Sequence, residues 1–362
     1  MQWFAIILVL PYTILLLIIF RGIKKIKPFK TNNKGTRFIS VIIPCRNEEE
    51  NLKGILKDLK SQNYPENLFE IILVDDSSDD NTAGTASTFK DELRNLSVIQ
   101  NSGKGKKAAI NTGISIARGS LIVTTDADCR MGPGWLRAIS DFHSESGSDL
   151  IICPVRMKGD KGFFSGLSEM EFLALQGITA GTASMGNPVM CNGANLAFSK
   201  ELYFNNQGDL HPSIPSGDDI FLLHSAKKDM KNIISWLELS DALAETASPS
   251  SFIKLIKQRK RWLSKAGAYD DLFTIVLGIV TFVTILLQAG TMALIPFDHT
   301  FIYIYLAVFL LKSLPDFIII RLAASRYNIK GIMQWFIPLQ VIYPFYVLIV
   351  AVTAITGSFR RN

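Results

Sequence analysis

Two aspartates one residue apart, Asp126 and Asp128, are the residues of this chain whose type and spacing most clearly suggest chemistry. They directly follow an apolar run at 121–123, which predicts that they lie at the carboxyl end of a buried strand. Open α/β sheets bind ligands at that edge. Adjacent carboxylates repel each other unless a cation joins them, and their hard oxygens suit Mg²⁺ or Mn²⁺ holding a diphosphate. A pair of solvated turn acids is the alternative, because short motifs often arise by chance.

Two further acidic clusters lie at the ends of predicted elements. Asp75-Asp76 closes the apolar run at 71–74, and Gly217-Asp218-Asp219 precedes the apolar run at 220–223. Either cluster alone can be an ordinary turn or helix cap. Three clusters that converge on one sheet edge are better explained by a shared site.

The elements that must position these acids alternate along the chain. Apolar runs predict strands at 38–43, 71–74, 98–99, 121–125 and 150–153. Helical spacing predicts helices at 47–61, 80–93, 106–118, 135–144 and 163–181. This alternation indicates an α/β fold with a mostly parallel, doubly wound sheet. Polar residues at 30–36 and Ser-rich residues at 244–251 indicate linkers.

Six motifs follow one another in a set order. They are VIIPCRNE at 41–48, VDDSSDDNT at 74–82, GKKAAIN at 105–111, DAD at 126–128, GDD at 217–219 and QRKRW at 258–262. From 38 to 262 the chain resembles a membrane-bound family 2 glycosyltransferase with the GT-A fold, in the branch related to cellulose, chitin and hyaluronan synthases. The third acidic motif is Gly-Asp-Asp, where the processive synthases usually have Thr-Glu-Asp.

The resemblance implies a role for each motif. On the donor side, Pro44, Arg46 and Glu48 would contact the nucleotide, and Asp76 would contact its base or ribose. Lys106 would contact a phosphate. Asp126 would contact the sugar nucleotide or the metal, and Asp128 would bind the metal directly. On the acceptor side the resemblance implies Asp219 as general base, Asp218 in support, and a lid formed by Gln258, Arg261 and Trp262.

Uncharged runs at 3–20, 272–296 and 331–359 are each long enough to span a bilayer. A weaker candidate at 301–323 contains Lys312 and Asp316, which are four residues apart and can pair on one helix face. Basic residues follow the first run, which favours an uncleaved anchor with its carboxyl side in the cytoplasm over a cleavable signal peptide. With four spans the Arg360-Arg361 pair would face outward, so either the charge rule fails there or one segment is re-entrant.

These features predict four parts. They are an N-terminal transmembrane anchor at 1–22, a GT-A domain at 37–250, a basic interfacial amphipathic helix at 251–270, and about three membrane segments at 271–359. The net charge of +6 is concentrated beside the membrane segments, which suits an anionic leaflet and not nucleic acid. The four cysteines are far apart, which indicates reduced thiols. We therefore expect an integral protein of a bacterial plasma membrane, with its catalytic domain in the cytoplasm.

The predicted reaction is an inverting, metal-assisted transfer of a sugar from a nucleotide-diphosphate donor to a lipid, a lipid-linked glycan or a polysaccharide. The alternatives are a nucleotidyl or phosphosugar transferase, and a catalytically degenerate membrane scaffold. Residues 192–195, Asn-Gly-Ala-Asn, are either a polar turn or part of an acceptor pocket, and the pocket is favoured. Glu169 and Glu171 are expected to be solvated.

Overall fold

The computed structural model describes residues 4–159 and 162–358, and the chain divides into two compact units. The sheet unit comprises Lys27–Lys158 and Met190–Ala247, and the helical unit comprises Met1–Ile26, Gly159–Val189 and Ser248–Asn362. Residues 1–3 of the predicted anchor and the Arg360-Arg361 pair lie outside the described residues. The predicted domain boundaries stay a prediction.

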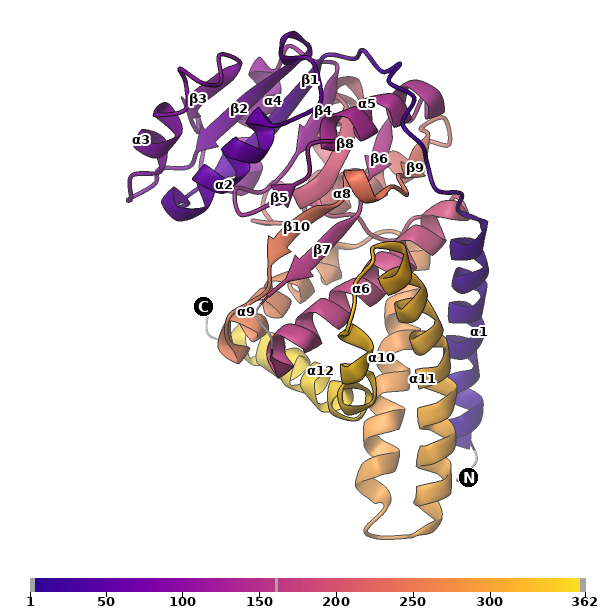
Figure 1. Ribbon diagram of the computed structural model, residues 1–362. Coiled ribbons are helices and arrows are strands. Elements are labelled where there is room, and N and C mark those ends of the chain that lie inside the picture. The colour runs from indigo at the N-terminus through magenta and orange to yellow at the C-terminus, as the bar shows by residue number, and fades with distance from the viewer. Residues whose placement is uncertain (1–3, 160–161, 359–362) are drawn as a thin grey trace. The chain divides into compact units, whose positions relative to one another are not determined.

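The sheet unit is built on a seven-stranded sheet in the order β3-β2-β1-β4-β8-β6-β9 (Figure 1). Its strands are β1 (Ile39–Cys45), β2 (Phe69–Asp75), β3 (Leu96–Gln100), β4 (Leu121–Thr124), β6 (Leu150–Ile152), β8 (Leu196–Ser199) and β9 (Ile234–Trp236). The first four strands are parallel to one another, and β8 runs antiparallel to both of its neighbours. The predicted mostly parallel α/β sheet is confirmed.

A second, three-stranded sheet joins β5 (Arg130–Met131), β10 (Ala244–Ala247) and β7 (Val155–Lys158), with β10 in the middle. The predicted linker at 244–251 is therefore wrong over its first four residues. β10 has no alternation of apolar residues, and its extended form depends on pairing with a strand on each side.

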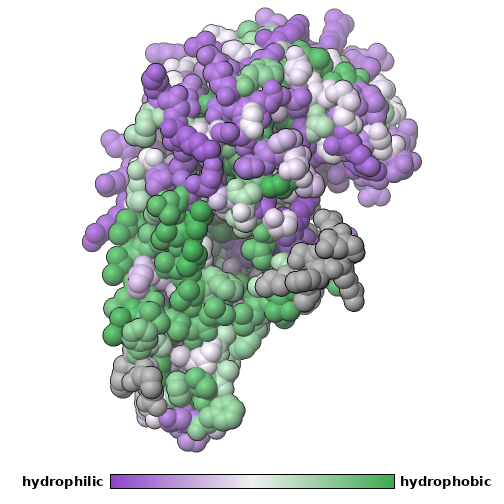
Figure 2. Space-filling model, turned by 180° about the vertical axis from the view of Figure 1, so that it is seen from behind, coloured by the Kyte–Doolittle hydropathy of each residue, from purple (hydrophilic) through white to green (hydrophobic). Residues whose placement is uncertain are grey.

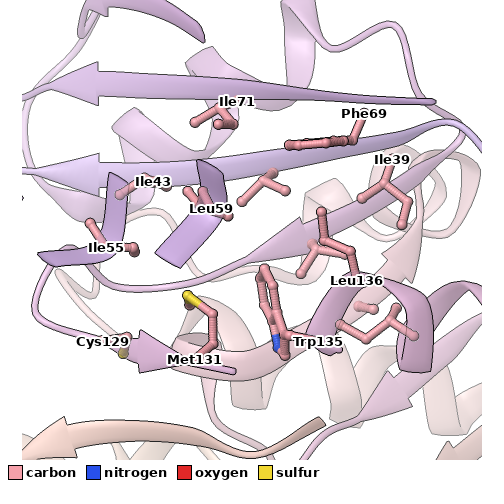
Figure 3. Close-up of a cluster of buried hydrophobic side chains, with 14 of the residues drawn as sticks. Ile39, Ile43, Ile55, Leu59, Phe69, Ile71, Cys129, Met131, Trp135 and Leu136 are labelled. Atoms are coloured by element: carbon pink, nitrogen blue, oxygen red, sulfur yellow. The ribbon is translucent and has the colours of Figure 1, made fainter. Parts of the chain in front are cut away.

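Helices cover both faces of the large sheet. They are α2 (Glu49–Lys60), α3 (Thr82–Ser87), α4 (Lys106–Ile116), α5 (Trp135–Ser146), α7 (Lys200–Asn205) and α8 (Asp218–Lys228). Every residue of β1 is buried because successive side chains point to opposite faces. On one face Ile43 lies toward α2 and α5 in the core cluster of Figure 3. On the other, α4 lies so close that a Cβ atom at Gly113 would stand 2.7 Å from Ile42.

The helix predicted at 80–93 is much shorter in the structure, where α3 begins at Thr82 and ends at Ser87. Its predicted first residue, Asp80, forms a turn instead. The Asp80 carboxylate accepts hydrogen bonds from the backbone N–H of Thr82 (3.0 Å) and of Glu49 (3.2 Å). This side chain competes with helical hydrogen bonding, as short polar residues commonly do.

The helical unit contains α1 (Phe4–Lys25), α6 (Phe163–Ser184), α9 (Phe252–Leu263), α10 (Leu272–Leu294), α11 (Thr300–Arg326), η6 (Ile332–Trp335) and α12 (Phe336–Ser358). Four described stretches are long and apolar enough to cross a membrane: Phe4–Lys25, Leu272–Leu294, Thr300–Arg326 and Ile332–Ala354. Figure 2 shows apolar side chains gathered over this unit. Length and composition therefore support the predicted membrane segments.

The charged pair inside α11 is neutralised within the bundle. Lys312 Nζ lies 2.8 Å from Asp316 Oδ2, which confirms the predicted pairing on one helix face. Tyr12 of α1 donates to the same carboxylate, and Gln340 of α12 accepts from Lys312. Three helices thus share one satisfied polar cluster, as charges in apolar surroundings require.

Candidate functional site

The carboxyl ends of the parallel strands form the edge where the predicted site residues gather. Cys45 at the end of β1 pairs with Asp75 at the end of β2, and β4 ends beside them at Thr124. The loops that follow carry the first, second and fourth of the motifs. This is the edge at which open α/β sheets bind ligands.

Asp76 organises the loop that leads into α4. Both of its carboxylate oxygens lie 2.9 Å from the Gly105 backbone N–H, and one also accepts from Asn101 Nδ2 at 2.7 Å. Gly105 precedes the first residue of α4 and has φ of +87°, a conformation that favours glycine. Asp76 therefore fixes the start of α4, and its predicted contact with the base or ribose stays a prediction. Asn101 was missed because it lies between two motifs.

Lys106, the first residue of α4, lies among several acids. Its Nζ pairs with Asp126 Oδ1. Burial by itself would lower the pKa of Lys106, but nearby carboxylate charges raise it overall. Those carboxylates belong to Asp126, Asp218 and Asp219. Two acidic motifs almost a hundred residues apart thus meet around one amine.

Asp128 is half-buried, like Asp126, but it has a different partner. Its Oδ2 accepts a hydrogen bond from Thr246 Oγ1 of β10 at 3.0 Å. Burial, together with the charge of Asp126, raises the pKa of Asp128. Two half-buried carboxylates with mutual repulsion fit a hard divalent cation such as Mg²⁺ or Mn²⁺. The described residues contain no cluster of three or more His, Cys, Asp or Glu suited to a metal.

Asp218 and Asp219 open α8, as the sequence predicts. The backbone N–H of Gly193 donates to Asp219 Oδ2 at 2.9 Å, and that of Ile220 donates to Oδ1 at 2.8 Å. Gly193 begins η2 (Gly193–Asn195), which leads directly into β8. Both oxygens of Asp219 are therefore oriented by backbone on the same side of the molecule as Lys106.

The first motif lies beside Asp126 and Asp128. Burial, followed by the charges of Asp128 and Asp126, raises the pKa of Glu48, although a hydrogen bond from Asn51 opposes this. Pro44 lies within β1. Arg46 is exposed, and its guanidinium forms an ion pair with Asp79 Oδ2 at 3.9 Å. The structure thus brings Glu48 within electrostatic reach of Asp126 and Asp128, while the predicted nucleotide contacts stay predictions.

Residues 192–195 form a structural turn. Asn195 is fully buried, and its amide donates to the carbonyl oxygens of Pro154 (2.7 Å) and Ala242 (2.8 Å). Its Oδ1 accepts from Trp135 Nε1 at 2.9 Å. The prediction that this turn lines an acceptor pocket is wrong for Asn195, because its whole amide is engaged by the fold.

A cavity of about 610 Å³ lies beside Asp128 and was missed by the sequence. Its walls carry two ion pairs, Arg130 with Asp58 at 2.6 Å and Lys158 with Glu245 at 2.9 Å. Such groups can hydrogen-bond a ligand rich in hydroxyls. The partners are 72 and 87 residues apart, so no local signal connects them.

The last motif lies on α9 in the helical unit. Gln258 accepts a hydrogen bond from Arg259, Arg261 is exposed, and the Arg259 guanidinium stands 4.1 Å from the centre of the Trp262 ring. Arg259 is buried and pairs with Glu171 of α6 at 2.7 Å.

The expectation that Glu171 is solvated is therefore wrong, because its partner lies 88 residues away. Tyr343 of α12 also donates to it, at 3.1 Å. These contacts hold α9 against α6 and α12. The predicted lid role of Gln258, Arg261 and Trp262 stays a prediction.

Comparisons with known proteins show the family and the fold that this chain resembles. The family model described as "Glycosyl transferase family 2" matches residues 40–204. Glycosyltransferase AglE of Haloferax volcanii is 37% identical over 115 residues, which are 32% of this chain and 38% of that protein. The undecaprenyl-phosphate 4-deoxy-4-formamido-L-arabinose transferase of Aeromonas hydrophila is 35% identical over 159 residues, 41% of this chain and 46% of that one. The matches thus span less than half of these relatives.

Among solved structures, the mannosyltransferase PcManGT from Pyrobaculum calidifontis, in complex with GDP-Man and Mn²⁺, superposes with a TM-score of 0.61. The match covers 98% of each chain at 18% sequence identity, so it shows the fold alone. The predicted GT-A fold is confirmed.

Proposed function

We propose, from the glycosyltransferase family 2 domain that this chain carries, that it moves a sugar from a nucleotide-diphosphate donor to an acceptor hydroxyl or phosphate at a membrane. The transfer is a single displacement that inverts the anomeric carbon. The acceptor is a lipid, a lipid-linked glycan or a polysaccharide. The enzyme lies in the plasma membrane with its sheet unit on the cytoplasmic side, where basic residues follow α1.

The observation that carries this proposal is that Lys106 of α4 is paired with Asp126 of the fourth motif and is also under the charges of Asp218 and Asp219 of the fifth. Donor chemistry needs positive charge for a diphosphate, and acceptor chemistry needs a carboxylate base nearby. Lys106 supplies the first need and Asp219 the second. Their proximity brings both halves of a transfer reaction to one edge of the sheet.

Asp219 is the better candidate for the base because backbone N–H groups orient both of its oxygens. It takes the proton from the acceptor hydroxyl as the acceptor oxygen bonds to the anomeric carbon. The bond from that carbon to the diphosphate oxygen breaks, and its electron pair leaves with the nucleoside diphosphate. A phosphate acceptor is already ionised and needs no base. Asp218, the preceding residue at the start of α8, adds a second negative charge that favours the protonated form of Lys106.

Asp128 and Asp126 would hold a divalent cation, which supplies positive charge to the departing diphosphate. Thr246 orients Asp128, and Lys106 shares Asp126. Glu48, Arg46 and Asp76 line the ends of β1 and β2, where the nucleoside would lie. Gln258, Arg261 and Trp262 would close over the diphosphate and acceptor.

A lipid-linked acceptor is supported by the four candidate membrane helices. Relatives of this chain include enzymes named as undecaprenyl-phosphate transferases. Only a short segment with η5 (Ala266–Ala268) separates the basic helix α9 from α10, so α9 is suited to the membrane surface.

The test is product analysis with the purified full-length chain, a panel of UDP- and GDP-sugars, and membrane lipid extract. We expect release of a nucleoside diphosphate, loss of turnover with EDTA, and roughly 10³-fold slower transfer to a hydroxyl acceptor in Asp219→Asn, with donor binding kept in calorimetry. Asp229→Asn removes the same charge at the exposed end of α8 and should change nothing. Pyrophosphate release, or unchanged turnover in Asp219→Asn with a hydroxyl acceptor, would refute the mechanism.

A further inference from the structure

The first turn of α4 carries two adjacent lysines that point to different partners. Lys106 pairs with Asp126, as described above. Lys107 instead donates to three backbone carbonyl oxygens of a single loop: those of Leu210 (2.6 Å), His211 (2.9 Å) and Ile214 (2.9 Å). An ammonium group has three N–H donors, so these carbonyls can satisfy all of them. Hydrogen bonds from an ionised donor are stronger than neutral ones.

This loop, residues 210–216, needs such an anchor. Most of its residues are exposed, and only Leu210 is buried. His211 has φ of +47°, a conformation that non-glycine residues adopt at a cost and keep only where contacts hold it. Besides the lysine contacts, the His211 ring packs on Phe221 of α8 with centroids 4.5 Å apart. The Lys107 ammonium also lies 5.3 Å from the centre of the Phe221 ring.

The anchored loop leads directly to the proposed base. It is followed by Gly217, whose φ of +96° turns the chain into α8, and then by Asp218 and Asp219. A neighbouring contact joins the same two regions, because Gln207 Nε2 donates to Asn111 Oδ1 of α4 at 2.7 Å. One helix thus contacts Asp126 through Lys106, and through Lys107 it contacts the loop that leads to the proposed base.

We propose that Lys107 is a positioning residue, which sets the placement of Asp219 relative to Asp126 and Asp128 through the backbone of residues 210–216. Lys107 itself does not touch substrate. The inference rests on the proposed function for its kinetic consequence, while the anchoring of the loop stands without it. A misplacement of about 1 Å at a reacting group can slow a reaction about 10²-fold.

The experiment compares Lys107→Met, Lys107→Arg and Lys200→Met in the full-length chain. Lys200 is the matched control, because its Nζ also donates to a backbone carbonyl, that of Ala117 at 2.6 Å, but at the far end of α4. We expect Lys107→Met to lower kcat 10- to 100-fold at unchanged donor KM, and Lys200→Met to leave both unchanged. Lys107→Arg keeps the charge, but its planar fork cannot match three converging carbonyls, so kcat should stay at least 5-fold low.

Hydrogen exchange of the loop amides provides a readout that needs no activity. The Ile214 N–H, which donates to His211 O at 3.0 Å, should exchange at least 10-fold faster in Lys107→Met than in the wild type or Lys200→Met. Full kcat in Lys107→Arg would assign the effect to charge and refute the positioning role. Unchanged exchange in Lys107→Met refutes the anchor whatever the activity. A wild-type chain that transfers no sugar, but loses loop protection in Lys107→Met, would count against the proposed function alone.

Discussion

Carboxylates at the two ends of the seven-stranded sheet have pKa values shifted in opposite directions. At the amino end, Glu70 of β2 accepts from Ser40 Oγ (2.6 Å), from the Arg118 backbone N–H (2.6 Å) and from Arg118 Nε (2.8 Å). Although burial opposes it, these hydrogen bonds and the arginine charge lower the pKa of Glu70. At the carboxyl end, burial and the charge of Asp126 raise the pKa of Asp128.

The difference separates a carboxylate that is engaged by the fold from one that is proposed to hold a cation. Glu70 joins β1, β2 and the turn before β4 into one network, since Ser40 Oγ in turn accepts from the Gly119 N–H at 2.9 Å. Its charge is fully used by the fold. The Asp126–Asp128 pair keeps a repulsion that Lys106 relieves only in part, which is the charge balance that the proposed cation site requires.

The largest expected effect is a loss of transferase activity when a carboxylate at the carboxyl end of the sheet is replaced. Asp128→Asn should lower transfer roughly 10³-fold, because the amide keeps the hydrogen bond from Thr246 but loses the charge that holds the cation. Its unfolding free energy should not fall, since the substitution also removes a like-charge repulsion. Turnover and urea unfolding of the detergent-solubilised full-length chain measure both quantities.

Glu70→Gln is the matched variant for that experiment, because it removes one negative charge at the opposite end of the same sheet. Activity per folded molecule should stay within about 2-fold of the wild type. A stable but inactive Glu70→Gln, or an unstable but active Asp128→Asn, would reverse the assignment of the two ends.

The next effect is on stability. Glu70→Gln should lower the free energy of unfolding by about 1–2 kcal/mol, because the new amide N–H₂ group faces the Arg118 Nε–H donor. This value is low for a hydrogen bond between charged groups, because the Arg118 side chain is exposed and water weakens its attraction to Glu70. Urea midpoints followed by tryptophan fluorescence measure it. Glu66→Gln, an exposed acid in the turn before β2, is the control and should change the midpoint little.

The sequence predicted the carboxyl end of the sheet better than the amino end. Asp126 and Asp128 follow an apolar run, and Lys106 begins a helix with clear spacing, so local periodicity placed both at the correct edge. The Lys312–Asp316 ion pair could be predicted equally well, because a spacing of four residues on one helix sets its geometry.

What could not be predicted depends on partners distant in the chain. Glu70 acquires its role from Arg118, Glu171 from Arg259, and Asp128 from Thr246, at separations of 48, 88 and 118 residues. β10, which carries Thr246, is a strand only because two other strands pair with it. Single-sequence patterns record local spacing and not such pairings, and therefore the cavity beside Asp128 was missed as well.

The smallest effect is the pH dependence of the Glu70 network. Because the pKa of Glu70 is lower in the folded chain than in the unfolded chain, where it is about 4.3, its stabilisation is fully present above that pH. It is lost as the pH falls through the folded pKa, since protonation removes the charge that Arg118 and Ser40 support. The difference in unfolding free energy between wild type and Glu70→Gln should therefore be constant from about pH 5 to pH 8 and shrink below about pH 4.3.

Groups other than Glu70 titrate alike in the two proteins, so the difference isolates this one carboxylate. Urea unfolding at half-unit steps between pH 3 and pH 8 measures it, with Glu66→Gln giving a difference near zero throughout. A wild-type advantage that persists undiminished at pH 3 would show that Glu70 stabilises the sheet by shape rather than by charge. The contrast between the two ends would then rest on the aspartates alone.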